Sequence, residues 1–167
     1  MLRCNSYLIN HDTLALEAVF VDGFKSRITT THGVYYSKMS IKSLLEEACI
    51  RYGSTFDGRV QAIRLFFEYL HKTPLLINPG EVGAFPTLSY LDPECVWLFN
   101  HHFQIKVLSA NRSEVIFSTG HSVQVNVSKR VLIKQQQRLS NAMETFRSMH
   151  RNKEVYIEKP QTVINLD

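Results

Sequence analysis

Residues 40–59 read SIKSLLEEACIRYGSTFDGR, and this stretch predicts two helices joined by a tight turn. The hydroxyl of Ser40 can accept a hydrogen bond from an orphan amide of the following turn, as an N-cap does. Gly53 marks the end of the first helix, because glycine readily adopts the left-handed conformation that follows a helix. The intervening apolar residues recur at helical spacing and form one stripe: Ile41, Leu44, Leu45, Ala48, Cys49 and Tyr52. A second helix follows residues 54–58, with Val60, Ile63, Phe67 and Leu70 facing inward, until Pro74 prevents continuation.

Short strands are predicted on both sides of this helical pair. Before it, Tyr7–Ile9 and three further segments form a β-meander in which Asp22-Gly23 is a strong hairpin turn. The three segments are Leu14–Val21, Arg27–Thr31 and Val34–Tyr36. After it, the predicted strands are Leu75–Ile77, Val96–Phe99, Phe103–Leu108, Glu114–Ser118 and Ser122–Val127, with 85–89 extended.

A long final helix, capped by Ser128, is predicted to reach about Arg151. Blocks of strands and helices in this order, without regular alternation, indicate the α+β class. The 167 residues predict one domain over residues 1–153 and a tail over 154–167 that is either mobile or a docking arm.

The composition is that of a globular chain, with 44% hydrophobic and 20% charged residues. No run of 18 apolar residues is present, so no transmembrane helix and no membrane partner are expected. The start of the chain, MLRCN, has neither the apolar region nor the cleavage site of a secretory signal. We therefore expect a cytoplasmic protein.

The positive charge is concentrated in one segment. The chain carries 19 Lys and Arg against 15 Asp and Glu, a formal net charge of +4. Residues 128–153 hold seven of the basic residues and a single acid, Glu144, whereas the remainder has 12 basic and 14 acidic residues. A basic segment on a near-neutral body is typical of a protein that binds a polyanion, although a solvated helix face would give the same pattern.

Signals of catalysis are weak. Cys4, Cys49 and Cys95 are far apart and contain no Cys-x-x-Cys pair, and the glycine-rich and nucleophile motifs of common enzymes are absent from the sequence. His101 and His102 would point to opposite faces of a strand, so they do not readily share a metal ion. We expect no enzyme activity, no cofactor and no metal.

Two segments have features of a binding surface. Around the predicted turn, four basic residues flank Ser54 and Thr55, and amides at the start of a helix favour an anion, so this region is a candidate phosphate cradle. The four are Arg51, Arg59, Arg64 and Lys72. An ordinary helical hairpin with capped ends and solvated arginines explains the same spacing and is preferred on spacing alone.

The second segment is the final helix. Arg130, Lys134 and Arg138 fall at i, i+4 and i+8, so three like charges share one face and DNA phosphates would compensate them. An apolar seam interrupted at Gln135 consists of Leu132, Leu139, Ala142, Phe146 and Met149. It packs either on the chain's own sheet, which is the default, or on a second copy as an oligomerisation surface.

A series of motifs resembles the competence transcription factor family, ComK. The first block is Cys49-x-Arg51-Tyr52-Gly53-Ser54-Thr55-x-x-Gly58-Arg59. It is followed in order by His71-Lys72-x-Pro74, Phe85-Pro86-Thr87-x-Ser89, Cys95-x-Trp97, His102, Val115-x-Phe117-x-x-Gly120 and Val127-Ser128 with Gln135 and Arg138. The resemblance extends over roughly residues 5 to 140 and is most specific in the middle block.

The resemblance implies a bacterial transcription activator of the competence regulon that binds A/T-rich boxes of duplex DNA, largely from the minor groove, as paired dimers. It implies RNA polymerase as a partner and a nucleoid-associated location. Better-known members have a longer C-terminal region implicated in adaptor-dependent proteolysis, of which Val155, Tyr156 and Ile157 would be a remnant.

Two other functions compete with this one. A single-stranded nucleic-acid binder would use Tyr35, Tyr36 or Trp97 as stacking platforms on a basic surface. A protein that binds no DNA would dock an acidic partner on its basic C-terminal helix.

Overall fold

The computed structural model describes residues 2–4 and 7–151, which form a seven-stranded sheet, a three-stranded sheet and three helices. The strands of the larger sheet lie in the order β1-β4-β3-β2-β7-β6-β5, and those of the smaller sheet in the order β10-β9-β8. In chain order the larger sheet contains β1 (Leu2–Cys4), β2 (Thr13–Val21), β3 (Phe24–Thr30), β4 (Gly33–Ser37), β5 (Leu75–Asn78), β6 (Val82–Pro86) and β7 (Val96–Phe99). The smaller sheet contains β8 (Phe103–Ser109), β9 (Arg112–Phe117) and β10 (Ser122–Val125). The helices are α1 (Ile41–Arg51), α2 (Phe56–Phe67) and α3 (Lys129–Arg151).

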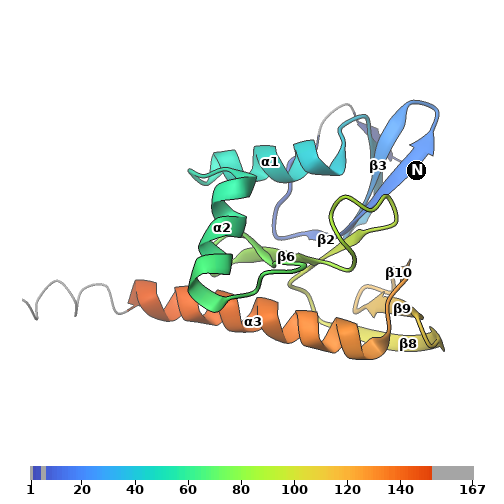
Figure 1. Ribbon diagram of the computed structural model, residues 1–167. Helices are drawn as coiled ribbons and strands as arrows, with labels where there is room; N and C mark the ends of the chain where they lie inside the picture. The colour runs from blue at the N-terminus through green and yellow to red at the C-terminus, as the bar shows by residue number, and fades with distance from the viewer. Residues whose placement is uncertain (1, 5–6, 152–167) are drawn as a thin grey trace, which may run out of the picture.

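The larger sheet lies between two helical layers. In Figure 1, α1 covers one face, and α3 together with the smaller sheet covers the other, while α2 runs from the first layer towards the second. Strand β7 contributes to both faces in alternation, because successive side chains of a strand point in opposite directions. Val96 and Leu98 pack in the cluster on the α3 side, and Trp97 and Phe99 pack in the cluster under α1 and α2.

The predicted α+β class and the order of its blocks are confirmed. Asp22 and Gly23 form the expected hairpin turn, and both have the positive φ, 51° and 80°, that a two-residue type I′ turn requires. Strand β1 pairs with β4 in parallel, whereas every other neighbouring pair of strands in the described residues is antiparallel.

Two local predictions were wrong. Tyr7–Ile9 lies in no strand, because Asn10 turns the chain by accepting the Asp12 amide, and Ile9 is buried without strand pairing. Helix α2 ends at Phe67, since Glu68 adopts the left-handed conformation at φ 59°, so Leu70 lies outside the helix and is 57% exposed.

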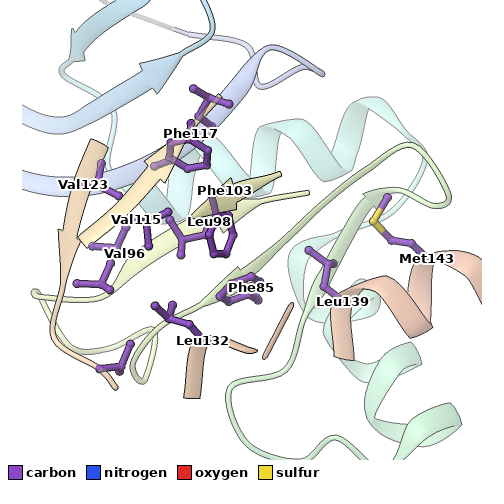
Figure 2. Close-up of a cluster of buried hydrophobic side chains, with 14 of the residues drawn as sticks. Phe85, Val96, Leu98, Phe103, Val115, Phe117, Val123, Leu132, Leu139 and Met143 are labelled. Atoms are coloured by element: carbon purple, nitrogen blue, oxygen red, sulfur yellow. The ribbon is translucent and has the colours of Figure 1, made fainter. Parts of the chain in front are cut away.

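The apolar seam of α3 packs inside the chain. Leu132, Leu139 and Ala142 are buried in the cluster that contains Phe85 of β6, as Figure 2 shows for Leu132 and Leu139. A Cβ atom added to Gly83 would lie 2.9 Å from Leu139 Cδ1, so the glycine permits α3 to approach β6 closely. These three residues are at most 2% exposed, so they favour packing on the chain's own sheet, which was the default expectation, over packing on a second copy. Of the other two seam residues, Phe146 is half-buried and Met149 is exposed.

The predicted tail at 154–167, including Tyr156, lies outside the described residues. Within the described residues, none of the helices combines the length and hydrophobicity needed to cross a membrane.

Candidate nucleic-acid interface

The turn between α1 and α2 is built from its own polar side chains. Gly53 has a φ of 81°, which places a left-handed residue after the helix as predicted. Thr55 caps α2 by accepting a hydrogen bond from the Gly58 amide at 2.9 Å. A Cβ atom on Gly58 would lie 3.0 Å from Ser54 Oγ and 3.1 Å from Thr55 Oγ1, so only glycine fits without displacing these hydroxyls.

Two of the amides at the start of α2 are hydrogen-bonded to side chains within the chain. The Phe56 amide donates to the Glu46 carboxylate of α1 at 3.2 Å, and the Gly58 amide donates to Thr55. Asp57 places an exposed carboxylate in the first turn of α2, 3.8 Å from Lys42 Nζ. The predicted phosphate cradle stays a prediction, in which these two amides are not free because internal side chains accept from them.

Arg59 and Arg51 differ in their surroundings although both flank this turn. The Arg59 guanidinium donates to the Tyr52 carbonyl at 2.8 Å, at the carboxyl end of α1 where a positive charge is favourable. The side chain of Arg51 is exposed and has no hydrogen-bond or ion-pair partner among the described residues. Arg51 is therefore available to a ligand, whereas Arg59 is held by the fold.

The connection at residues 68–74, between α2 and β5, is fastened to α3 by a buried glutamine. The Gln135 amide donates to the Lys72 carbonyl at 2.8 Å and to the Pro86 carbonyl at 3.1 Å. Lys72 has a φ of 48°, a conformation that a residue other than glycine adopts only when its surroundings hold it there. Gln135 is thus a positioning residue for the connection.

Arg138 belongs to the same assembly. Its guanidinium donates to the His71 carbonyl at 3.2 Å and lies 4.8 Å from the centroid of the Tyr69 ring, within cation–π range. Arg130 and Lys134 are exposed on the preceding turns of α3. The predicted stripe of three equivalent charges is therefore divided: the first two residues face solvent, and the third is half-buried against the connection.

A pocket of about 280 Å³ opens between the second half of α2, this connection and residues 86–90. Arg64 and Lys72 line it together with His71, Ser89 and Tyr90. The Arg64 Nε atom donates to Thr73 Oγ1 at 3.3 Å, and the rest of its guanidinium has no hydrogen-bond partner among the described residues. Two of the predicted DNA-binding residues are thus brought together with three polar side chains that spacing alone did not connect.

The basic residues near the end of α3 are paired. Arg147 and Arg151 contact Glu144 at 3.2 Å and 2.7 Å, and their hydrogen bonds, from Arg151 first, lower the pKa of Glu144. Arg147 also donates to the Gly80 carbonyl at 2.6 Å. This part of the basic segment is consequently less available to a polyanion than Arg130 and Lys134.

The predicted site residues thus fall into separate groups. Arg51, Ser54 and Thr55 lie at the start of α2, whereas Arg64, Lys72 and Arg138 lie near its end (Figure 1). Helix α2 has 12 residues and is about 18 Å long, so no small ligand touches both groups.

Sequence reasoning missed the roles of Glu46 and Gln135. Helical spacing gives no sign that the Glu46 carboxylate of α1 reaches the Phe56 amide of the next helix. Gln135 carried a signal, since a polar residue that interrupts an apolar seam is buried only where it has hydrogen-bond partners. His71 and Ser89 stood in the quoted motifs without an assigned role.

The fold and this site define an α+β protein with a cationic pocket and further exposed cations at the end of α1 and on α3. Residues 4–153 match the family model described as ComK protein, and the chain belongs to this family. It is 29% identical over 126 residues to a protein of Bacillus subtilis (strain 168) named Competence transcription factor. That match covers 74% of this chain and 66% of the relative, just under two thirds of its length. No solved structure matches the chain.

Proposed function

We propose that this protein is a transcription factor for competence genes that binds duplex DNA. The observation that carries the proposal is the match to the ComK family over residues 4–153, together with the name of the Bacillus subtilis relative. That membership supports a role in DNA binding rather than catalysis.

The distribution of charge supports DNA as the partner. Arg51, Arg64, Lys72, Arg130 and Lys134 have no ion-pair partner among the described residues. Cations that no internal carboxylate neutralises can replace the counterions of DNA phosphates, which is the dominant source of affinity for duplex DNA.

The finer parts of the proposal concern recognition and assembly. A/T-rich boxes would be recognised from the minor groove, where a narrow A-tract concentrates negative potential that attracts arginine. The protein would act as dimers paired on one promoter, in the cytoplasm on the nucleoid, with RNA polymerase as a partner and a proteolytic adaptor as a further candidate. Of the two arginines that flank the α1–α2 turn, Arg51 is the one proposed for the groove, because it is exposed and has no partner among the described residues, whereas Arg59 donates to the Tyr52 carbonyl.

A single-stranded nucleic-acid binder is less well supported. Trp97, one of its expected stacking platforms, is 2% exposed and packs against Phe56 with ring centroids 6.1 Å apart. Tyr35 is half-buried and contacts the rings of Tyr7 and His32.

Competition between duplex and single-stranded DNA tests the proposal. A labelled A/T-rich duplex is bound to the protein at low salt, and unlabelled duplex or either separated strand is added. We expect the duplex to compete at much lower concentration than the strands. Equal or better competition by a single strand would reject duplex binding, and no retention at low salt would favour the protein-docking alternative.

A further inference from the structure

The pocket at the end of α2 has the composition of a phosphate-binding site. Arg64 and Lys72 supply two cations, and His71, Ser89 and Tyr90 supply ring nitrogen and hydroxyl groups. None of the described residues that line it is acidic. The adjoining hollow along α2 contains Asp57, so the anion-favouring part is the one next to the connection.

Several donors there remain without a partner in the chain. The terminal nitrogens of Arg64 and the ammonium of Lys72 make no hydrogen bond to any described residue. The Ser89 hydroxyl accepts a hydrogen bond from the Leu91 amide at 3.4 Å, so its own proton is available to donate. A planar guanidinium beside a hydroxyl donor and an ammonium is well suited to the tetrahedral oxygens of a phosphate.

The pocket is also preorganised. The Gln135 amide fixes the Lys72 carbonyl at 2.8 Å, and Thr73 holds both ends of the connection by donating to the Tyr69 carbonyl at 2.6 Å and accepting from Arg64. The negative end of the α2 dipole lies nearby, but it amounts to about half an elementary charge, whereas Arg64 and Lys72 provide two full charges.

We propose that this pocket seats a phosphate of the DNA backbone. The inference rests on the proposed function and refines it, since it assigns this pocket to positioning the duplex and not to reading its bases. Phosphate contacts fix register and orientation and carry no direct sequence information. The seat is formed by segments from α2, the connection and residues 86–90, which spacing alone does not join.

Arg64→Gln and Ser89→Ala test the seat, and Arg112→Gln is the matched control. Arg112 is an exposed arginine of β9 in the smaller sheet, away from α2, where it donates to Gln124 at 2.7 Å. For each protein, affinity for an A/T-rich and a G/C-rich duplex is measured at several salt concentrations. We expect Arg64→Gln to weaken both complexes about tenfold at low salt, with the slope of log K against log salt reduced by about 0.9 and the A/T preference unchanged.

Ser89→Ala should weaken both duplexes less strongly, and Arg112→Gln should leave the slope as in the wild type. If Arg64→Gln and Arg112→Gln changed duplex affinity and its salt dependence equally, the proposed phosphate site would be rejected. The loss of any surface charge would then explain the result. A wild-type protein that binds no duplex would instead overturn the proposed function.

A second experiment distinguishes a phosphate of the DNA backbone from a free phosphate ion. Amide resonances of Lys72 and Ser89 are followed by NMR during titration with duplex and, separately, with inorganic phosphate. Shifts saturated by duplex, with only weak effects of inorganic phosphate, support the DNA seat. Saturation by inorganic phosphate with no further change on adding duplex would assign the pocket to a free anion and overturn the proposal.

Discussion

At the scale of single residues, the arginines that flank the α1–α2 turn have different roles. Arg59 donates to the Tyr52 carbonyl at the end of α1, so its charge stabilises the turn, whereas Arg51 faces solvent. In the sequence both flank the same glycine-containing turn, and spacing does not distinguish them. The difference depends on the orientation of α2 relative to α1, which spacing along the chain does not determine.

Arg59→Ala should therefore lower the free energy of unfolding by about 1–2 kcal/mol, since a hydrogen bond from a charged donor is lost. Arg51→Ala should change stability by less than about 0.5 kcal/mol, as expected for an exposed side chain, and weaken duplex binding. Urea unfolding and a DNA titration on both variants measure these effects. The assignment of roles is contradicted if Arg51→Ala is the less stable of the two.

Cys49 is the residue with the clearest predicted pH dependence. Burial is the main cause that raises its pKa from 9.0 to about 11. Because the folded value lies above the unfolded one, the thiol's contribution to stability is complete below about pH 9 and is lost as the pH rises towards about 11.

The stability difference between wild type and Cys49→Ala should consequently shrink over that interval. Urea unfolding of both proteins at a series of pH values measures this difference. The Cys49→Ala variant shows how much of the pH dependence comes from Tyr and Lys residues. A difference that stays constant from neutral pH to pH 11 would mean that the folded state accommodates the thiolate.

At the scale of elements, α3 was predicted with nearly correct bounds but with an open choice of packing partner. Ser128 caps it through a 3.3 Å hydrogen bond from the Val131 amide, as the sequence indicated. Its apolar seam fits either a sheet or a second helix, because periodicity shows that a face is buried and not what covers it. Gly83 in β6 leaves room for Leu139 of α3 against the sheet, and no helical pattern could reveal that.

Leu139→Ala should lower the free energy of unfolding by about 2–5 kcal/mol, because it leaves a cavity under α3. Met149→Ala, on the same seam but 47% exposed, should change it by less than about 0.5 kcal/mol. Thermal or urea unfolding of both variants compares them. If both variants changed the free energy of unfolding by similarly small amounts, Leu139 would not be a core residue. The apolar seam would then again be a candidate dimer contact.

Gln135 connects α3 with the pocket. Gln135→Ala should lower the free energy of unfolding by about 1–3 kcal/mol, since the partly buried Lys72 carbonyl and the buried Pro86 carbonyl lose their donor. It should also weaken duplex binding, because the connection that carries Lys72 loses its anchor. Gln137→Ala, an exposed glutamine of the same helix, is the control for both measurements. If the Gln135→Ala protein folded and bound DNA with unchanged affinity, the position of the connection would not matter for DNA binding.

At the scale of the whole molecule, the fold class and most strands followed from apolar patterns and turn residues. Val96–Phe99 was predicted with its observed bounds, since it is a continuous apolar run between loop segments. The pocket could not be predicted, because Arg64, Lys72 and Ser89 meet only through the docking of β6 and α3. The concentration of charge in residues 128–153 was also only partly informative, since Arg138, Arg147 and Arg151 bind acceptors within the chain.

Among the described residues, several cations without an ion-pair partner lie at the end of α1, on α2, on the connection and on the first turns of α3: Arg51, Arg64, Lys72, Arg130 and Lys134. Such a set of cations predicts that contacts with DNA phosphates provide most of the affinity for duplex DNA. The specificity of the complex must then come from a smaller number of contacts, of which Arg51 is the main candidate for a narrow groove.

The most direct test of this account is a titration of A/T-rich and G/C-rich duplexes of equal length at two salt concentrations. We expect tighter binding of the A/T-rich duplex at both, and log K that falls with log salt by about 0.9 for each phosphate contacted. A minor-groove ligand such as distamycin should displace the protein, whereas major-groove methylation should not. Equal affinity for the two duplexes, or binding that does not depend on salt, would contradict the account.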